Sequence, residues 1–389
     1  MCVLEEMLSM DKKKILFVSN IAGKKVGSFS IASIYASEKN NLDFHLASNF
    51  NASSLDERKK DEEKYGITLH HIDFARNPLH PQNLKAYQQL VKLMKNEQFD
   101  MVHCNTPVGG LIGRIVAKKY KIKHVIYQAH GFHFYKGAPK LNWLVYYPIE
   151  RLLAHWTDAL ITINQEDYQA AQNFKLRNNG HVYYVPGVGI NLSEYENIHI
   201  NRAAKRSTLG LSEKDFVLLS AGRLDYNKNN ATIIKAVAKL NNPRVHFVLC
   251  GDGAERPKLS ELAATLKVSD QIHFLGNRSD MKELYCTADV FVMASFREGL
   301  SRSIMEAMAC GLPCIVSRIR GNVDLIQKEK GGFLVSPTSV QEFSEKINIL
   351  LESDSLLKEM STFNRAYVQN FELKKVITKM TDIYKEIIK

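Results

Sequence analysis

Residues 290–316 read VFVMASFREGLSRSIMEAMACGLPCIV. Short apolar runs at 290–293 and 313–316 predict two buried strands. Between them, residues 295–303 are mostly small and polar, which predicts a loop, and a helix starts within 304–309. A strand, a helix and a second strand in this order form a βαβ unit. The stretch therefore predicts a parallel sheet with helices packed on it.

The same alternation extends along most of the chain. Segments of helical period lie between most of the apolar runs, for example at 81–96 and 109–120, and helices at 340–352 and about 373–388 end the chain. Helices that connect parallel strands cover both faces of a sheet. The other strands are predicted at 13–20, 43–47, 68–72, 100–104, 123–128, 159–163, 215–223, 245–250, 272–275 and 332–335.

The alternation pauses once, at residues 185–206, where glycine, proline and polar residues dominate. We interpret this segment as a linker, because 389 residues are enough for two domains. We predict an N-terminal Rossmann-like domain at 1–189 and a C-terminal one at 190–372, with the helix at about 373–389 packing back on the first. Because ligands of such sheets bind beyond the carboxyl ends of the strands, a cleft between the domains is the expected site.

The composition predicts a folded protein with an anionic partner. Hydrophobic residues make up 45% of the chain and charged residues 24%, which is enough for a sizeable core. The formal net charge is +11. This excess suggests nucleic acid, a membrane surface or a phosphorylated substrate, and the alternative is a soluble protein that is simply basic.

Cysteine spacing and the N-terminus bear on the cellular compartment. The six cysteines form no CxxC pair and no zinc-ligand spacing, which fits a reducing cytoplasm. No apolar stretch approaches the roughly 18 residues that cross a bilayer. The opening residues, MCVLEEMLSMDKKK, have the wrong order for a signal peptide, and we expect about the first ten to be a disordered extension.

Two glutamates, Glu298 and Glu306, are separated by seven residues in the loop and helix of the opening stretch. A helix N-terminus supplies free N–H groups and a positive dipole end, which suit phosphate. Carboxylates accept hydrogen bonds from the hydroxyls of a sugar or a ribose. The alternative is one acidic residue favoured near a helix N-terminus and one solvated glutamate.

A second polar element, SAGRLDYNKNN, follows the first strand of the C-terminal domain. It places Arg223 and Lys228 in one loop after Gly222. Two cations beside a cleft can hold a diphosphate and stabilise it as a leaving group. The alternative is a pair of ordinary surface cations.

Together, SFREGLSRSIMEAMACGLP and AGRLDYNK resemble the signatures of retaining glycosyltransferase family 4, and the order of elements matches along most of the chain. The resemblance implies the α/β GT-B fold, in which two Rossmann-like, doubly wound domains face a central cleft. It implies that Glu298 contacts hydroxyls of the donor sugar and that Glu306 holds the ribose. It also implies that Arg223 and Lys228 bind the diphosphate.

The resemblance assigns further donor-binding positions. The backbone of Gly299, Leu300 and Ser301 approaches the donor sugar and phosphate, and Ser301 stands where the family often has proline. Arg278 lies in GNRSD, the segment expected near the base. Uracil is the commoner base in the family, so UDP is the expected nucleotide, with an N-acetylhexosamine as the expected sugar.

The N-terminal domain adds His130, Gly23 and Gly27. His130 follows a predicted strand, and the resemblance places a histidine there near the donor sugar, with His133 a weaker candidate. The alternative for a lone histidine is a core or surface residue. Gly23 and Gly27, after the first strand, would let the backbone approach the donor phosphates. The elements HGFHF and TDALITINQEDYQAA resemble the subgroup that builds bacterial capsule, exopolysaccharide and O-antigen chains.

No Asp-x-Asp motif occurs in the chain, and we expect no metal and no cofactor. Arg223, Lys228 and helix N-termini can neutralise the leaving group instead. The resemblance implies that the anomeric configuration is retained. The acceptor then attacks the face from which the leaving group departs, and the leaving phosphate helps to deprotonate it.

The segment 110–151 gives a clue to the acceptor. It holds eight lysines or arginines, one acid (Glu150) and several aromatic residues, namely Phe132, Phe134, Tyr135, Trp143, Tyr146 and Tyr147. Such interleaving suits an anionic bilayer surface or nucleic acid, and the donor-site elements favour the bilayer. The alternative is a solvated helix face with its aromatic residues in the core.

These patterns predict transfer of a sugar from a nucleotide diphosphate sugar to a polyprenyl-diphosphate-linked saccharide. The enzyme is expected in the cytoplasm, associated with the inner face of the cell membrane, without a nucleic-acid partner. Two alternatives are a GT-B nucleotide-sugar epimerase and a non-catalytic membrane-associated partner protein. A nucleic-acid binder rests on charge alone.

Overall fold

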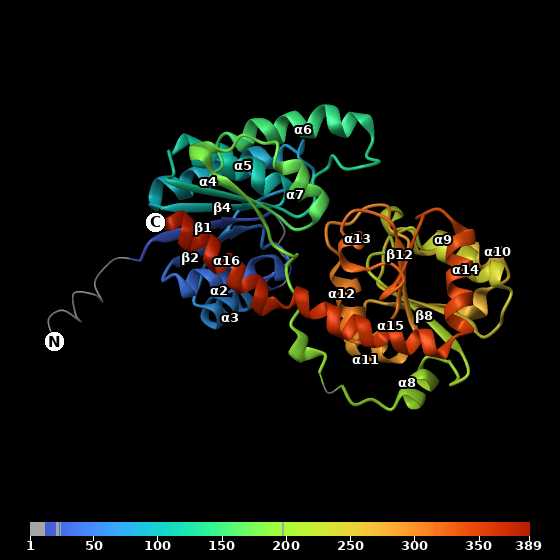
Figure 1. Cartoon of the computed structure of the whole chain (residues 1–389). Helices are drawn as coiled ribbons and strands as arrows, with labels where there is room; N and C mark the ends of the chain where they lie inside the picture. The colour runs from blue at the N-terminus through green and yellow to red at the C-terminus, as the bar shows by residue number, and fades with distance from the viewer. Residues whose placement is uncertain (1–11, 21–22, 24, 197) are drawn as a thin grey trace. The chain divides into compact units, whose positions relative to one another are not determined.

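The computed structural model describes residues 12–20, 23, 25–196 and 198–389, and these form two compact units (Figure 1). The N-terminal unit comprises Met1–Val188 and Leu373–Lys389, and the C-terminal unit comprises Gly189–Glu372. The extension expected over the first ten residues lies outside the described residues.

Within its described residues, the N-terminal unit holds a seven-stranded parallel sheet in the order β3-β2-β1-β4-β5-β6-β7. Its strands are β1 (Lys14–Val18), β2 (Asp43–Ser48), β3 (Thr68–His71), β4 (Met101–Asn105), β5 (His124–Ala129), β6 (Ala159–Thr162) and β7 (His181–Tyr184). Its helices are α2 (Ser28–Lys39), α3 (Leu55–Tyr65), α4 (Gln82–Asn96), α5 (Pro107–Lys119), α6 (Lys140–Ala154), α7 (Gln165–Ala171), η1 (Arg177–Asn179) and α16 (Leu373–Ile388).

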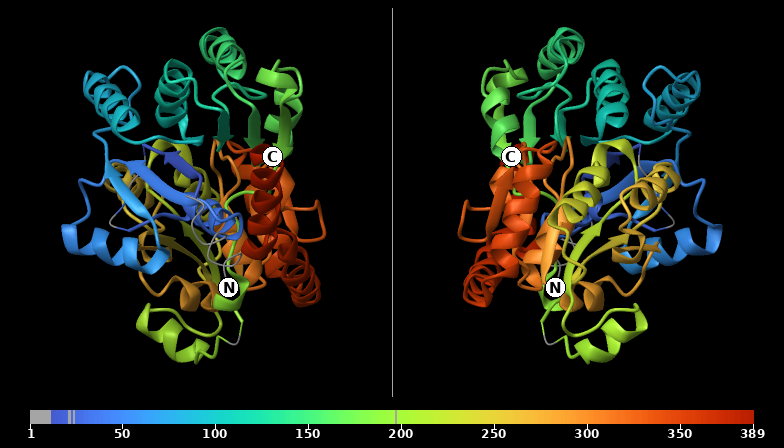
Figure 2. Two further views of the ribbon diagram at one scale, coloured as in Figure 1. Left: turned by 90° about the vertical axis from the view of Figure 1, so that its left-hand side faces the viewer. Right: turned by 90° about the vertical axis from the view of Figure 1, so that its right-hand side faces the viewer.

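Both faces of this sheet are buried, because successive side chains of a strand point to opposite faces. Ile15 and Phe17 of β1 lie in the core that includes α2 and α16, whereas Leu16 and Val18 lie in the core that includes α4 and α5. Figure 2 shows these two layers of helices on either side of the sheet. The sequence of β1 is therefore one continuous apolar run, without the alternation of apolar and polar residues found in strands that are buried on one face.

The last helix returns to the N-terminal unit. Val376, Met380 and Tyr384 of α16 are buried in its core, alongside α2. The Tyr384 hydroxyl lies 2.7 Å from Nδ1 of His103, a fully buried residue of β4. Packing of α16 thus makes the C-terminal segment part of the N-terminal unit.

Within its described residues, the C-terminal unit holds a six-stranded parallel sheet in the order β10-β9-β8-β11-β12-β13. Its strands are β8 (Phe216–Ala221), β9 (Val245–Cys250), β10 (Ile272–Gly276), β11 (Val290–Met293), β12 (Cys314–Ser317) and β13 (Gly332–Val335). Its helices are η2 (Leu192–Glu194), α8 (Arg202–Thr208), η3 (Tyr226–Lys228), α9 (Asn230–Leu240), α10 (Arg256–Thr265), η4 (Ser269–Gln271), α11 (Met281–Thr287), α12 (Arg302–Ala309), α13 (Asn322–Leu325), α14 (Val340–Leu351), α15 (Asp354–Tyr367) and η5 (Val368–Phe371).

The strand orders confirm the predicted α/β fold of two Rossmann-like, doubly wound domains. In each sheet, the first three strands are added in sequence toward one edge, and the fourth strand is added on the other side of the first. This switch point lies between β1 and β4 in the N-terminal unit and between β8 and β11 in the C-terminal unit. Ligands of doubly wound sheets bind beyond the carboxyl ends of the strands at this switch point.

The predicted linker is too long at its C-terminal end. Residues 185–206 were expected to lack regular structure, but α8 begins at Arg202. The side chain of Asn201 accepts a hydrogen bond from the N–H of Ala204 at 2.9 Å and so caps the helix.

Across the described residues, every helix is too short or too polar to cross a membrane.

Candidate active site

The candidate site in the C-terminal unit is built from two loops at the switch point. Residues 222–229 follow β8, and residues 294–301 follow β11, its neighbour in the sheet. The N–H of Phe296 donates to the carbonyl oxygen of Asn227 at 2.8 Å. The Asn227 side chain donates to the carbonyl oxygen of Arg297 at 3.0 Å. These bonds hold the loops together without any ligand.

Asn229 fixes the end of the first loop. Its φ of 48° lies in the left-handed region, which asparagine tolerates better than most residues. Its side chain donates to the carbonyl oxygens of Ala294 and Pro337. The Asp225 side chain accepts from the N–H of Lys228 at 3.1 Å. The backbone around Lys228 is therefore positioned by side-chain bonds at both ends.

Lys228 and Glu298 form an ion pair between the two loops. Lys228 Nζ lies 2.8 Å from Glu298 Oε1, and the side chains are 19% and 15% exposed. Gly222 lies against this lysine: a Cβ added there would be 3.0 Å from Lys228 Cε, and the φ of 149° disfavours other residues. The structure thus brings together three residues predicted from the sequence.

Arg223 is placed differently from Lys228. Its side chain is 68% exposed, and its ion pair with Asp225 is long, at 3.7 Å. An exposed guanidinium on this loop can turn toward a diphosphate at little cost. The two predicted cations therefore differ, since one is held in place and the other extends into solvent.

The segment Gly299-Leu300-Ser301 leads into α12. Leu300 and Ser301 are buried, and Ser301 is the residue immediately before the helix. A Cβ on Gly321 would lie 2.0 Å from the carbonyl oxygen of Gly299, so only glycine fits there. The Arg320 side chain donates to the carbonyl oxygen of Glu298 at 3.3 Å. Residues 320–321 therefore contact the backbone of this loop and constrain its conformation. Ser301 occupies the position at which the family often has proline.

Both carboxylate oxygens of Glu306, in the second turn of α12, are engaged. The Tyr285 hydroxyl donates to Oε2 at 2.9 Å, and Arg302 Nε lies 2.9 Å from Oε1. Burial, and then the Glu306 charge, raise the pKa of Tyr285 well above its ordinary value. Each carboxylate oxygen can accept a further bond, so an oriented Glu306 can still bind two hydroxyls.

Sequence patterns did not predict that Tyr285 and Arg302 belong to this site. Arg302 could have been found, because it precedes Glu306 by four residues on one helix face. Tyr285 lies on α11, and nothing in its neighbourhood of the sequence points to Glu306.

Arg278 follows β10 and does not take part in the Lys228–Glu298 pair. Its guanidinium donates to Asp280 twice, at 2.8 and 2.6 Å. Asp280 also accepts from Lys205 at 2.6 Å. The Arg278 hydrogen bond is the main reason that the pKa of Asp280 lies well below its ordinary value. Arg278 is thus held by Asp280 after the last residue of β10, and its place at the base stays a prediction.

In the N-terminal unit, His130 directly follows β5. Both ring nitrogens are buried, and neither has a hydrogen-bond partner among the described residues. The ring meets that of Phe29 edge-on, with 4.5 Å between centroids. Burial lowers the pKa of His130 to about 3, so the imidazole is neutral at neutral pH. It can give one hydrogen bond and accept another. His133, in contrast, stacks on Tyr146 with 4.6 Å between centroids.

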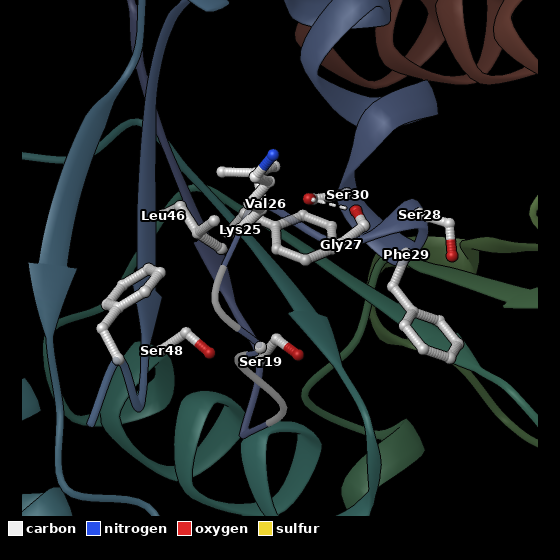
Figure 3. A pocket seen from close by; sticks show the side chains of 12 residues that line it. Ser19, Lys25, Val26, Gly27, Ser28, Phe29, Ser30, Leu46 and Ser48 are labelled. Atoms are coloured by element: carbon white, nitrogen blue, oxygen red, sulfur yellow. Dashed lines mark hydrogen bonds between the residues drawn. The ribbon is translucent and has the colours of Figure 1, made fainter. Parts of the chain in front are cut away.

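A cavity of about 240 Å³ lies at the ends of β1 and β2 in the same unit (Figure 3). The predicted residues Gly23 and Gly27 both line it. Ser19 and Ser48 contribute hydroxyls from neighbouring strand ends, and the buried Ser48 hydroxyl has no partner among the described residues. Phe29, which contacts His130, also lines the cavity. Gly23 and Gly27 therefore line the cavity, whereas His130 contacts one of its lining residues, Phe29.

The segment 110–151 requires a correction. Arg114 is 1% exposed and is paired at 2.9 Å with Glu150, so it is not a surface cation. Phe132 and Phe134 are buried in the core. The basic and aromatic surface expected here is smaller than predicted, because α5 turns Arg114 inward and the loop after β5 turns Phe132 and Phe134 into the core. Among the described residues, no three His, Cys, Asp or Glu side chains form a group that could hold a metal ion.

Two family profiles match the chain. The family described as "Glycosyl transferases group 1" matches residues 201–367, and the family described as "Glycosyl transferase 4-like" matches residues 14–164. A Bacillus subtilis (strain 168) protein, provisionally named the glycosyltransferase EpsD, is 37% identical over 329 residues, or 83% of this chain and 84% of the relative. The chain therefore belongs to this family of glycosyltransferases, and the predicted resemblance and enzyme class are confirmed.

Two further proteins are similar. The Escherichia coli enzyme named UDP-Gal:alpha-D-GlcNAc-diphosphoundecaprenol alpha-1,3-galactosyltransferase is 31% identical over 312 residues, covering 79% of this chain and 80% of that enzyme. The crystal structure of Anabaena HepE, in complex with UDP and glucose, matches with a TM-score of 0.77. It is 21% identical and covers 96% of this chain and 100% of its own, so this likeness supports the GT-B fold.

Proposed function

We propose that this glycosyltransferase moves a sugar from a UDP-sugar to a polyprenyl-diphosphate-linked saccharide in the synthesis of a bacterial surface polysaccharide. The Lys228–Glu298 pair carries the proposal, because it joins a diphosphate-binding cation to a hydroxyl-binding carboxylate at the switch point of the C-terminal sheet. The family membership and the substrates named for the E. coli relative support it.

The donor would exchange partners with the ion pair. Lys228 would turn from Glu298 to the diphosphate, and the freed carboxylate would accept bonds from the donor sugar. Arg223, which is largely exposed, would approach the same diphosphate. Glu306 would accept the ribose hydroxyls while Tyr285 keeps its carboxylate oriented. Positive charge at the departing diphosphate lowers the barrier to its departure.

The backbone of Gly299, Leu300 and Ser301 would lie along the donor sugar and phosphate, and Arg278 would lie at the base. Gly23 and Gly27 would leave room for the donor phosphates beside the N-terminal cavity. His130, held neutral, would share hydrogen bonds with a sugar hydroxyl. A neutral imidazole suits an uncharged hydroxyl, because it can both donate and accept.

We propose retention of the anomeric configuration. The departing phosphate would take the proton of the attacking hydroxyl on the same face of the sugar. This route needs cations on the leaving group, which Lys228 and Arg223 supply. It needs no protein carboxylate as a nucleophile.

The acceptor proposal rests on chemistry that the E. coli relative's name gives, a saccharide on diphosphoundecaprenol. Such an acceptor is held in a bilayer, so we place the enzyme at the inner face of the cell membrane. For the donor sugar we keep the sequence-based hypothesis of an N-acetylhexosamine, and the galactose of the relative is the leading competitor.

A panel of donors tests the proposal. Purified protein is incubated with UDP- and GDP-sugars, with and without a synthetic polyprenyl-diphosphate sugar, and nucleotide release and product mass are followed. Acceptor-dependent product from one UDP-sugar is expected. Conversion of the donor sugar without acceptor would favour the epimerase. UDP binding without turnover on any acceptor would favour the non-catalytic partner protein.

A further inference from the structure

Helix α6 displays large apolar side chains to solvent. Large apolar residues are usually buried, and a contiguous exposed set marks an interaction surface. Residues 141, 144, 145, 148, 149 and 152 recur at helical spacing and are all exposed, so they form one stripe along the helix. The exposed large apolar side chains of α6 and their exposed fractions are Leu141 (66%), Trp143 (41%), Leu144 (73%), Val145 (41%), Ile149 (40%) and Leu152 (57%).

The opposite face of α6 already has its packing partners. The Tyr147 ring contacts those of Phe134 and Phe174 at centroid distances of 5.1 and 5.6 Å. Glu150 reaches inward to the buried Arg114 at 2.9 Å. The stripe is therefore additional to the face that holds the helix to its own unit. Figures 1 and 2 show α6 on the outer side of that unit, farther from the sheet than α5.

The charged side chains that α6 itself exposes, Lys140 and Arg151, have one sign. Lys136 and Lys140 are exposed where α6 begins, and Arg151 is exposed where it ends. Glu150 is the acidic residue of α6, and it faces inward. An apolar stripe with cations at both ends and no exposed carboxylate matches an anionic bilayer.

We infer that α6 is the element that docks this enzyme on an anionic bilayer, with its stripe in the boundary between headgroups and acyl chains. Lys136, Lys140 and Arg151 would meet lipid phosphates. A helix of this length is about 22 Å long, which is too short to span a bilayer, so it lies in the plane of the surface. The inference rests on the proposed function, because a lipid-linked acceptor gives the enzyme its reason to be there.

Charge argues against the other obvious occupant, a second copy of the chain. Two α6 helices packed on their stripes would bring Lys136, Lys140 and Arg151 of one copy toward the same cations of the other. Neither copy has an exposed carboxylate on α6 to offset them. The phosphate groups of an anionic bilayer would offset these cations directly.

The test uses the full-length protein and phosphatidylcholine vesicles with and without phosphatidylglycerol. Neither donor nor acceptor is present. Wild-type protein should sediment with the phosphatidylglycerol vesicles. Leu144→Glu should weaken binding about tenfold or more, since it removes a leucine that the bilayer would bury and adds a charge that the anionic lipids repel. The matched control is Leu79→Glu, because Leu79 is 91% exposed, lies outside α6 and belongs to the same unit.

Fluorescence gives an independent readout. The chain has two tryptophans, Trp143 in α6 and Trp156 just beyond it. Because Trp143 packs against Phe134 and Tyr147 on the inward face, the reporter is placed in the stripe itself. In a Leu144→Trp variant that also carries Trp143→Phe and Trp156→Phe, tryptophan emission should shift to the blue and be quenched by brominated lipid. No shift together with no sedimentation would overturn the inference.

Other outcomes separate the competing occupants. If Leu144→Glu and Leu79→Glu bind vesicles equally well, α6 is not the docking element. If Leu144→Glu lowers the molar mass in lipid-free buffer and leaves vesicle binding unchanged, the stripe is a dimer interface. Vesicle binding by a protein that transfers no sugar to any acceptor supports the inference and contradicts the proposed function, so the two can fail separately.

Discussion

Lys228 Nζ lies 2.8 Å from Glu298 Oε1 although the two residues are 70 positions apart in the chain. The contact exists because β8 and β11 are neighbours in the sheet, so the loops that follow them meet at its carboxyl edge. In the proposed mechanism, the donor separates this pair, because its diphosphate binds Lys228 and its sugar hydroxyls bind Glu298.

Lys228→Ala should lower kcat/KM for sugar transfer about a hundredfold or more, because it removes the fixed positive charge from the leaving diphosphate. Steady-state kinetics with the preferred UDP-sugar measure the loss. Lys258→Ala is the matched control, since Lys258 pairs with Glu255 at 2.9 Å and is 73% exposed. Equal activity of the two variants would remove Lys228 from the site.

Gly222→Ala should weaken UDP binding as well as stability. The new methyl group would press on Lys228 Cε at 3.0 Å, and the φ of 149° would be strained. Gly210→Ala is the comparison, because Gly210 also has a positive φ, 74°, but a Cβ there meets nothing within 4 Å. The midpoint temperature of thermal unfolding should be lower in both variants. Titration calorimetry should find weaker UDP binding in Gly222→Ala alone.

Tyr285→Phe should weaken UDP binding by about fivefold, which corresponds to about 1 kcal/mol for one hydrogen bond to Glu306. Tyr183→Phe is the control, because the Tyr183 hydroxyl also bonds to a glutamate, Glu386, but in the N-terminal unit. If the two variants bind UDP equally well, Tyr285 does not orient Glu306 for ribose.

His130 should make folding sensitive to acid. Its pKa is about 3 when folded, against an ordinary value of 6.5, so the unfolded chain binds the proton first as pH falls. The stabilisation is complete above pH 6.5 and is lost toward pH 3, by up to about 1.4 kcal/mol per pH unit. His130→Gln should lose less stability than wild type between pH 7 and pH 5 in urea unfolding. An equal loss would show that His130 is not held neutral.

Sequence patterns located the elements well where a strand is apolar and bounded by polar residues. The strands β9 and β11 begin and end at the residues that the apolar runs predicted, 245–250 and 290–293. The edge strand β7 (His181–Tyr184) was missed, because its side chains are exposed or half-exposed and its short run of valine and tyrosine borders the segment that we interpreted as the linker.

Side-chain direction was the part that the sequence could not supply. In the segment 110–151, Arg114 is a cation by sequence but lies buried against Glu150. Helix α6 is apolar on both faces, so its sequence does not say that Leu144 faces solvent while Tyr147 faces the core. Only the packing of neighbouring elements decides these directions.

The most direct test of the account is the product that wild-type protein makes from a UDP-sugar and a polyprenyl-diphosphate-linked acceptor. Mass spectrometry and the anomeric proton coupling in NMR are measured on the purified lipid product. The account predicts a mass gain of one sugar residue, with the anomeric configuration of the donor retained. An acceptor unchanged in mass with every UDP-sugar, or a product of inverted configuration, would contradict it.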